Sequence, residues 1–258
     1  MNKILQLFLV VLLCASPAWA QWTHVNSEGA QEKVGDSIIT LNPTANPATD
    51  SIVVVVCSTD NPDNTGPGEK TFHTITDDQG SSWTRLMEYQ SAGNANAGVI
   101  TSVWASKLGA TITGNVTCTL GQDRSAKVLI MSEYTVAAGQ TFSNAGAART
   151  SGSGTSPSIL LTGLPSAEYN WIGVLGTEGP SGDSFTEDGD YTQRNRTGTT
   201  GGGAAGNQTA NLGNRILTAT SDTYNPTQAD RDFVIILVAL EEVTPPTGNT
   251  QGIVIGSD

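Results

Sequence analysis

Ser51-Ile52-Val53-Val54-Val55-Val56-Cys57-Ser58 is a short run dominated by β-branched residues, and no charged residue interrupts it. Such a run is typical of a strand that is covered on both faces. The chain contains one comparable run near its other end, Asp232-Phe233-Val234-Ile235-Ile236-Leu237-Val238-Ala239-Leu240. We expect the two runs to be central strands of one core, with the residues between them supplying further strands and loops.

The residues between these runs favour short strands joined by polar turns. Gly, Thr, Ser and Asn are abundant, aromatic residues make up only 6% of the chain, and no segment has the apolar period of a three-turn helix. Closely spaced strands without helical crossovers pair antiparallel and pack as two sheets. The sequence therefore predicts an all-β fold, an antiparallel two-sheet β-sandwich of the jelly-roll or lectin-like kind, over residues 21–243. Within it, residues 137–156 are predicted to be a long connection and residues 197–213 a loop.

The first 20 residues have the pattern of a signal peptide. Lys3 supplies the positive start, an apolar segment follows, and Ala18-Trp19-Ala20 is a small-x-small cleavage signal. The apolar segment is shorter than the ~20 residues that a membrane-spanning helix needs. We expect cleavage after Ala20 and a protein that is secreted, extracellular or on the cell surface, with the periplasm as an alternative, and with no membrane span after cleavage.

The last residues, 244–258, are predicted to be a linker and a short tail. Thr244-Pro245-Pro246-Thr247-Gly248-Asn249 has linker composition, and Gly252-Ile253-Val254-Ile255-Gly256 is a compact β-branched run beyond it. The tail is therefore a candidate for self-association by adding a strand to a sheet edge, in its own chain or a neighbour's. A frayed terminus is the alternative.

The charge of the chain argues against nucleic acid as a partner. Lys and Arg total 12 against 24 Asp and Glu, which gives a net charge of −12, and losing Lys3 with the signal peptide would make it −13. The basic residues are scattered, whereas phosphate contacts need them clustered. The acidity suits contact with cations.

Two cysteines remain after cleavage, Cys57 and Cys118, and each lies in a predicted strand. An oxidising compartment favours a disulfide between them. Two buried free thiols, packed as small hydrophobic residues, are the alternative.

Three short motifs resemble those of a β-sandwich domain of bacterial, or phage-borne, surface proteins. Asp77-Asp78-Gln79-Gly80-Ser81-Ser82-Trp83 is similar to its D-x-x-G-N-x-W turn, with Ser81 in place of the usual Asn. Ser102-Val103-Trp104-Ala105-Ser106-Lys107 is similar to its S-x-W-Y-A-K segment, and Ser132-Glu133-Tyr134-Thr135 to S-E-Y-S-G without the Gly. The resemblance covers about residues 51–136. It implies an extracellular β-sandwich domain used in adhesion or glycan contact, and it offers no established catalytic residues to carry over to this chain.

Patterns for catalysis are weak. Glu88 and Glu133 each precede a tyrosine near a predicted strand end, and would form the pair of a retaining glycoside hydrolase if they lay about 5.5 Å apart. Ordinary strand-end residues are the alternative. His24 and His73 are the only histidines, and neither a G-x-S-x-G elbow nor a zinc-ligand spacing accompanies them. Gly201-Gly202-Gly203-Ala204-Ala205-Gly206 fits G-x-G-x-x-G, but no apolar helix follows it, so we interpret it as a flexible loop.

Polar loops supply the candidate ligand and metal residues. Loop carboxylates, amides and an aromatic ring offer what a sugar needs, and loops commonly carry recognition on such folds. The three acids of Glu187-Asp188-Gly189-Asp190 could bind Ca²⁺, the one cofactor for which the sequence offers candidate ligands, although turn acids that cap their own backbone are the alternative. The candidate ligand residues are Asp60, Asn61, Asp63, Asn64, Tyr191, Gln193, Arg194 and Asn195.

From these patterns we expect a secreted or surface-displayed binding and adhesion module, without enzymatic activity, that contacts a glycan or another cell-surface ligand. A structural subunit of an extracellular or virion assembly is the first alternative, and a glycoside hydrolase is the second.

Overall fold

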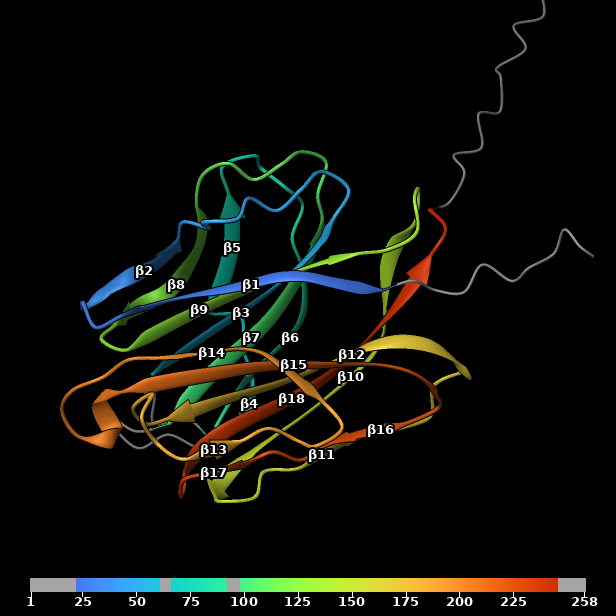
Figure 1. Ribbon diagram of the computed structural model, residues 1–258. Coiled ribbons are helices and arrows are strands. Elements are labelled where there is room, and N and C mark those ends of the chain that lie inside the picture. Colours follow the sequence, from blue (N-terminus) through green and yellow to red (C-terminus); the bar gives the residue numbers. More distant parts are fainter. Residues whose placement is uncertain (1–21, 61–65, 92–97, 246–258) are drawn as a thin grey trace, which may run out of the picture.

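The computed structural model describes residues 22–60, 66–91 and 98–245, which form β-strands and a single 3-10 turn, η1 (Ala204–Gly206; Figure 1). The predicted signal peptide, the loop residues Asn61, Asp63 and Asn64, and the predicted tail strand at residues 252–256 lie outside the described residues. The predicted all-β class, with antiparallel sheets packed against each other, is confirmed.

Two large sheets pack face to face. The first has the strand order β1-β9-β3-β7-β6-β4 and the second has the order β10-β18-β12-β15-β14. The first sheet consists of β1 (Thr23–Glu32), β9 (Lys127–Thr135), β3 (Ile52–Asp60), β7 (Val99–Lys107), β6 (Thr84–Gln90) and β4 (Gly68–Glu69). The second consists of β10 (Thr141–Gly154), β18 (Arg231–Val243), β12 (Ala167–Glu178), β15 (Gln208–Ala219) and β14 (Thr192–Gly198).

Smaller strand groups cover the outer faces of both sheets. Over the first lies a three-stranded sheet of β2 (Asp36–Leu41), β8 (Val116–Arg124) and β5 (His73–Asp77). Over the second lie two strand pairs, β11 (Ile159–Leu161) with β16 (Asp222–Tyr224) and β13 (Phe185–Thr186) with β17 (Thr227–Gln228).

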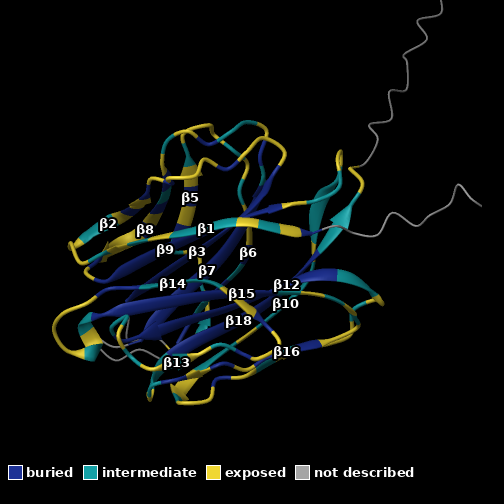
Figure 2. Cartoon of the chain, in the orientation of Figure 1, coloured by how far each residue is buried: buried dark blue, intermediate teal, exposed yellow. Residues whose placement is uncertain are grey.

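These covers explain why the two apolar runs lack polar breaks. On β3, Val54 and Val56 face the core between the large sheets, whereas Val55 and Cys57 face the cover. Strand β18 divides its residues in the same way between the inter-sheet core and the core under its own cover. Both strands are internal to their sheets and their middle residues are buried on both faces, drawn dark blue in Figure 2. Strand β3 is central as predicted, whereas the centre of the second sheet is β12, with β18 beside it.

The disulfide predicted between Cys57 on β3 and Cys118 on β8 is present. It ties the first large sheet to its cover.

The prediction that residues 137–156 are a connection and residues 197–213 a loop was wrong, because both segments contain strands. Residues 141–154 form β10, the edge strand that pairs with β18, and residues 208–213 begin β15. Both segments are rich in Gly, Ala, Asn and Thr, so their strand character comes from pairing with apolar neighbours and not from their own alternation.

The second half of the chain repeats the topology of the first. In each half, which we call the first repeat (23–135) and the second repeat (141–243), the opening strand pairs with the last strand, and the last strand pairs with the central one. The central strand then pairs with β7 or β15, and these pair with β6 or β14. The covers also correspond, because β2 pairs with β8 as β11 pairs with β16.

Irregularities of the ladders repeat as well. The bulge in β1 lies opposite Tyr134, which pairs with Ile52, and the bulge in β10 lies opposite Leu240, which pairs with Asn170. If Ile52 corresponds to Asn170, then Val56 corresponds to Val174. Val56 pairs with Val103 on β7, and Val174 pairs with Leu212 on β15. The bulge of β6 lies opposite Val103, and the bulge of β14 lies opposite Leu212. Strand order, register and both bulges therefore agree between the repeats.

Candidate functional site

The central strands of both repeats end at the same end of the sandwich. Each ends on a threonine followed by an acid, Thr59-Asp60 on β3 and Thr177-Glu178 on β12. Gly176 permits the close approach of the two strands. A Cβ atom at Gly176 would lie 2.0 Å from Thr101 Oγ1 and 2.6 Å from Ser58 Oγ. This end of the molecule therefore gathers acids from both repeats.

An open groove of about 270 Å³ lies beside Glu178. Glu178 is nearly buried, and its Oε2 accepts a 2.6 Å hydrogen bond from Gly98 N, which belongs to the other repeat. Burial raises the pKa of Glu178, the bond from Gly98 opposes this, and the charge of Asp232 adds to the rise. Burial and the charge of Asp230 also raise the pKa of Asp232. The groove is lined by Ser153, Glu178, Ala204, Asp230, Arg231 and Asp232.

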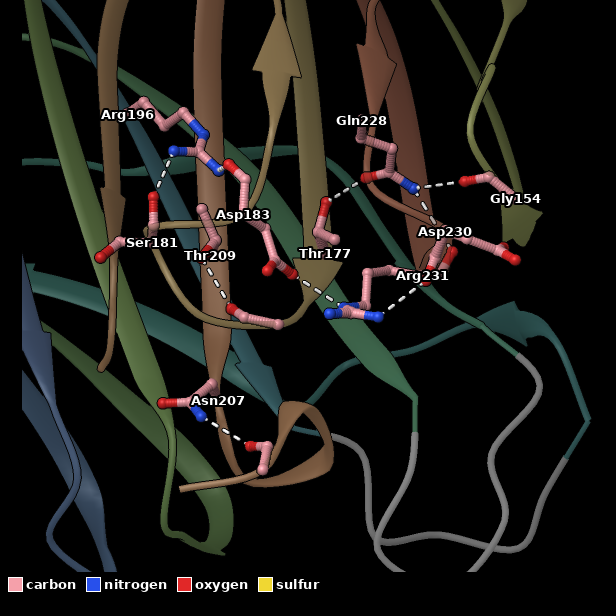
Figure 3. Close-up of polar contacts among 12 residues, drawn as sticks. Gly154, Thr177, Ser181, Asp183, Arg196, Asn207, Thr209, Gln228, Asp230 and Arg231 are labelled. Carbon is pink, nitrogen blue, oxygen red and sulfur yellow. Dashed lines mark hydrogen bonds and ion pairs between the residues drawn. The ribbon is translucent and has the colours of Figure 1, made fainter. Parts of the chain in front are cut away.

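Hydrogen bonds hold the wall of the groove in place (Figure 3). Arg231 Nε donates to Asp183 Oδ2 at 2.8 Å, which fixes the guanidinium between the groove and the loop before β13. Gln228 on β17 accepts from Thr177 Oγ1 at 2.7 Å and donates to Gly154 O at 3.0 Å. The end of β12 is thereby joined to β17 and to the end of β10.

Arg196 on β14 supports the loop that carries Asp183. Its Nη1 donates to Ser181 O at 2.6 Å and its Nη2 to Asp183 O at 3.1 Å, and its guanidinium lies 5.1 Å from the centre of the Phe185 ring. Burial lowers the pKa of Arg196, and the charge of Asp183 opposes this. Carbonyl groups that would otherwise lack donors are satisfied in this way. Asp183 is consequently held where it can pair with Arg231.

A small cavity lies behind this loop, with a volume of about 10 Å³. That is room for about one water molecule. Asn211 contributes to its wall, and Asn211 Oδ1 is buried without a hydrogen-bond partner among the described residues. A bound water would satisfy this oxygen, whereas a sugar ring is too large for the cavity. The open groove is the better candidate for a ligand.

The predicted ligand residues separate in the structure. Asp60 lies at the groove end of the sandwich, as the last residue of β3. Tyr191 is buried, donates to Asp222 Oδ2 at 2.9 Å and packs on Tyr224 with ring centres 4.8 Å apart, so its ring offers no platform to a sugar. Gln193, Arg194 and Asn195 lie on β14 at the end away from the groove, where Arg194 Nε donates to Asn214 Oδ1 at 2.5 Å.

The predicted calcium ligands are engaged with protein groups. Glu187 Oε2 accepts from Asn211 Nδ2, and the two oxygens of Asp188 accept from the backbone of Asp190 and Asn225. Asp190 forms an ion pair with Arg215. Among the described residues, only Cys57, His73 and Cys118 bring three ligating atoms within 4.8 Å of one another. Calcium at residues 187–190 stays a prediction, and at this place the ion would compete with Arg215 for the carboxylate of Asp190.

The glutamates considered for hydrolysis do not form a pair. Glu88 accepts from the backbone N–H groups of Phe72 and His73, and Glu133 accepts from Ala48 N and Ser51 Oγ. They lie on β6 and β9, three strand positions apart in the first sheet. At about 4.8 Å per strand the separation is roughly 14 Å, which is too far for either hydrolytic geometry.

Sequence reasoning did not find Glu178, Asp230, Arg231, Asp232 or Asp183. They come from three separated segments of the chain, which only the fold brings together. One signal was available. Gly176-Thr177-Glu178 follows an apolar run in the same way as Ser58-Thr59-Asp60.

Comparisons with models of protein families, with curated proteins and with solved structures found no match to this chain. Within the part of the chain that the structure describes, no helix has the length and apolar character needed to cross a membrane.

Proposed function

We propose that this protein is a binding and adhesion module, secreted or displayed on a cell surface, whose ligand is a glycan held in the groove beside Glu178. The observation that supports the proposal is the composition of this open 270 Å³ groove. Carboxylates of Glu178, Asp230 and Asp232 accept hydrogen bonds from sugar hydroxyls, and Arg231 donates to sugar oxygens. Pairing with Asp183 holds Arg231 in place before a ligand arrives, which lowers the entropic cost of binding.

A second candidate, a glycoside hydrolase, is favoured by one observation. Burial and, to a smaller extent, the charge of Asp232 raise the pKa of Glu178, while burial and the charge of Asp230 raise the pKa of Asp232. A carboxyl group whose ionisation is hindered beside other carboxyl groups is the kind of group that general acid catalysis of glycoside cleavage uses. The binding function needs no such chemistry, so the two candidates separate in a single experiment.

The test uses the chain from residue 21 onward on a glycan array, with size-exclusion chromatography alongside. We expect binding that the variant Asp232→Asn weakens and the control variant Asp190→Asn, far from the groove, leaves unchanged. Incubation of a bound glycan with the protein should yield no new reducing ends. Release of reducing ends that Glu178→Gln abolishes would establish the hydrolase instead. Absence of any glycan binding together with large ordered oligomers would overturn both and favour a structural subunit.

A further inference from the structure

We propose that Cys57, Cys118 and His73 form a binding site for a thiophilic divalent cation, with Zn²⁺ as the test ion, when the disulfide is reduced. The three ligating atoms lie within 4.8 Å of one another and all three residues are buried. The three ligands lie on β3, β8 and β5, which are separated in the sequence, so no short ligand spacing in the sequence reveals the site.

The geometry needs little change to accept the ion. With Zn–S bonds of about 2.3 Å and Zn–N bonds of about 2.0 Å, two atoms bound to one zinc lie roughly 3.5–3.8 Å apart. One ring nitrogen of His73 already lies within 4.8 Å of both sulfurs. Opening the S–S bond therefore supplies most of the required movement.

Contacts around His73 suit a ligand. Its Nδ1 lies 2.8 Å from Ser102 Oγ and its Nε2 lies 3.3 Å from Thr59 Oγ1. Whichever nitrogen binds the metal, the other keeps a hydroxyl partner, and such partners orient metal-binding histidines. Burial lowers the pKa of His73 to about 3, so the ring is neutral, as ligation requires.

The charge also balances. A dithiol or phosphine reductant transfers two electrons to the disulfide and yields two thiols, which release two protons when the ion binds. Two thiolates and a neutral imidazole then cancel the double positive charge, so the buried site carries no net charge.

The second repeat has the same strand topology without these three residues. Leu175 occupies the ladder position of Cys57. On the cover, Tyr224 pairs with β11 as Cys118 pairs with β2, and Glu187 directly follows β13. The correspondence extends to their contacts, since Glu187 binds Asn211 as His73 contacts Ser102. The sulfur and imidazole donors thus belong to the first repeat alone.

The test begins with the full chain from residue 21, unfolded with a phosphine reductant and refolded without oxygen, with and without one equivalent of Zn²⁺. We expect one tightly bound zinc per chain after gel filtration, two thiols protected from alkylation, and a higher unfolding midpoint with zinc than without. Cys57→Ser with Cys118→Ser should abolish binding, and His73→Gln should weaken it at least tenfold. His24→Gln, which changes the only other histidine, is the matched control and should bind like the parent chain.

Three outcomes would overturn the proposal. A reduced chain that folds but retains no zinc would do so, as would zinc binding that His73→Gln leaves unchanged. Failure of the reduced chain to fold even with zinc would also count against it, because the bound ion should replace the cross-link between β3 and β8. Circular dichroism of the refolded chain separates the first outcome from the third.

Discussion

Single positions show how the two repeats fill the same place with different chemistry. Glu88 on β6 and Arg196 on β14 hold corresponding ladder positions. Each is the second paired residue after the bulge of its strand. Glu88 accepts hydrogen bonds from the backbone N–H groups of Phe72 and His73, whereas Arg196 donates to the backbone carbonyls of Ser181 and Asp183. Either charge can hold the start of the covering strand, because an extended backbone offers both donors and acceptors.

The buried His73 predicts a pH dependence of stability. Its pKa is lowered from 6.5 to about 3 in the folded chain, so between these values the unfolded chain binds the proton more tightly. The neutral ring contributes fully above pH 6.5, and its contribution is lost as the pH falls towards 3. His73→Gln should therefore flatten the decline in unfolding free energy over this range by up to about 1.4 kcal/mol per pH unit.

Urea unfolding at intervals between pH 7 and pH 4 checks this. His24→Gln is the comparison, since His24 is only partly buried and should alter the slope less. Parallel pH profiles for the parent chain and His73→Gln would contradict the prediction.

At the scale of strands, the sequence predicted the elements whose own residues are apolar. It missed the elements that form strands because they pair with an apolar neighbouring strand. The runs around Val54 and Ile236 are internal strands buried on both faces, and the predicted disulfide joins Cys57 to Cys118. Strand β10 was missed because half-buried small residues such as Ala147 and Ala148 carry little apolar signal of their own and form a strand by pairing with β18. The groove was missed for a related reason, since residues of β10, β12, η1 and β18 line it together.

The crossing of the central strands offers a test at this scale. Gly176→Ala should destabilise the chain by about 1–3 kcal/mol, because the new methyl group would meet Thr101 Oγ1 and Ser58 Oγ within 3 Å. The matched control is Gly182→Ala, where a Cβ atom meets nothing within 4 Å. Chemical denaturation should place the control within about 0.5 kcal/mol of the parent chain. An equal loss of unfolding free energy in both variants would show that the close approach of the strands at Gly176 is not the cause.

For the whole molecule, the core between the two sheets binds the repeats into one cooperative unit. Val54 and Val56 of the first repeat share this core with Val234 and Ile236 of the second, and all four are fully buried. Separating the repeats would expose this surface, so neither should remain folded alone while the other unfolds.

Equilibrium unfolding should therefore follow a single transition. Far-ultraviolet circular dichroism, which reports on both repeats, and tryptophan fluorescence should give the same midpoint. Three of the four described tryptophans, Trp22, Trp83 and Trp104, lie before β10, and only Trp171 lies after its start. Independent unfolding of the repeats would appear as two transitions with a fluorescence midpoint displaced from that of circular dichroism.

Matching bulges in β1 and β10, and again in β6 and β14, place the same irregularities in both halves of one chain. In a homodimer of two such halves every substitution would appear twice, whereas in a single chain it appears once. Cys57, Cys118 and His73 can therefore stand in one half while Leu175, Tyr224 and Glu187 stand in the other, so each half carries its own chemistry on a shared scaffold.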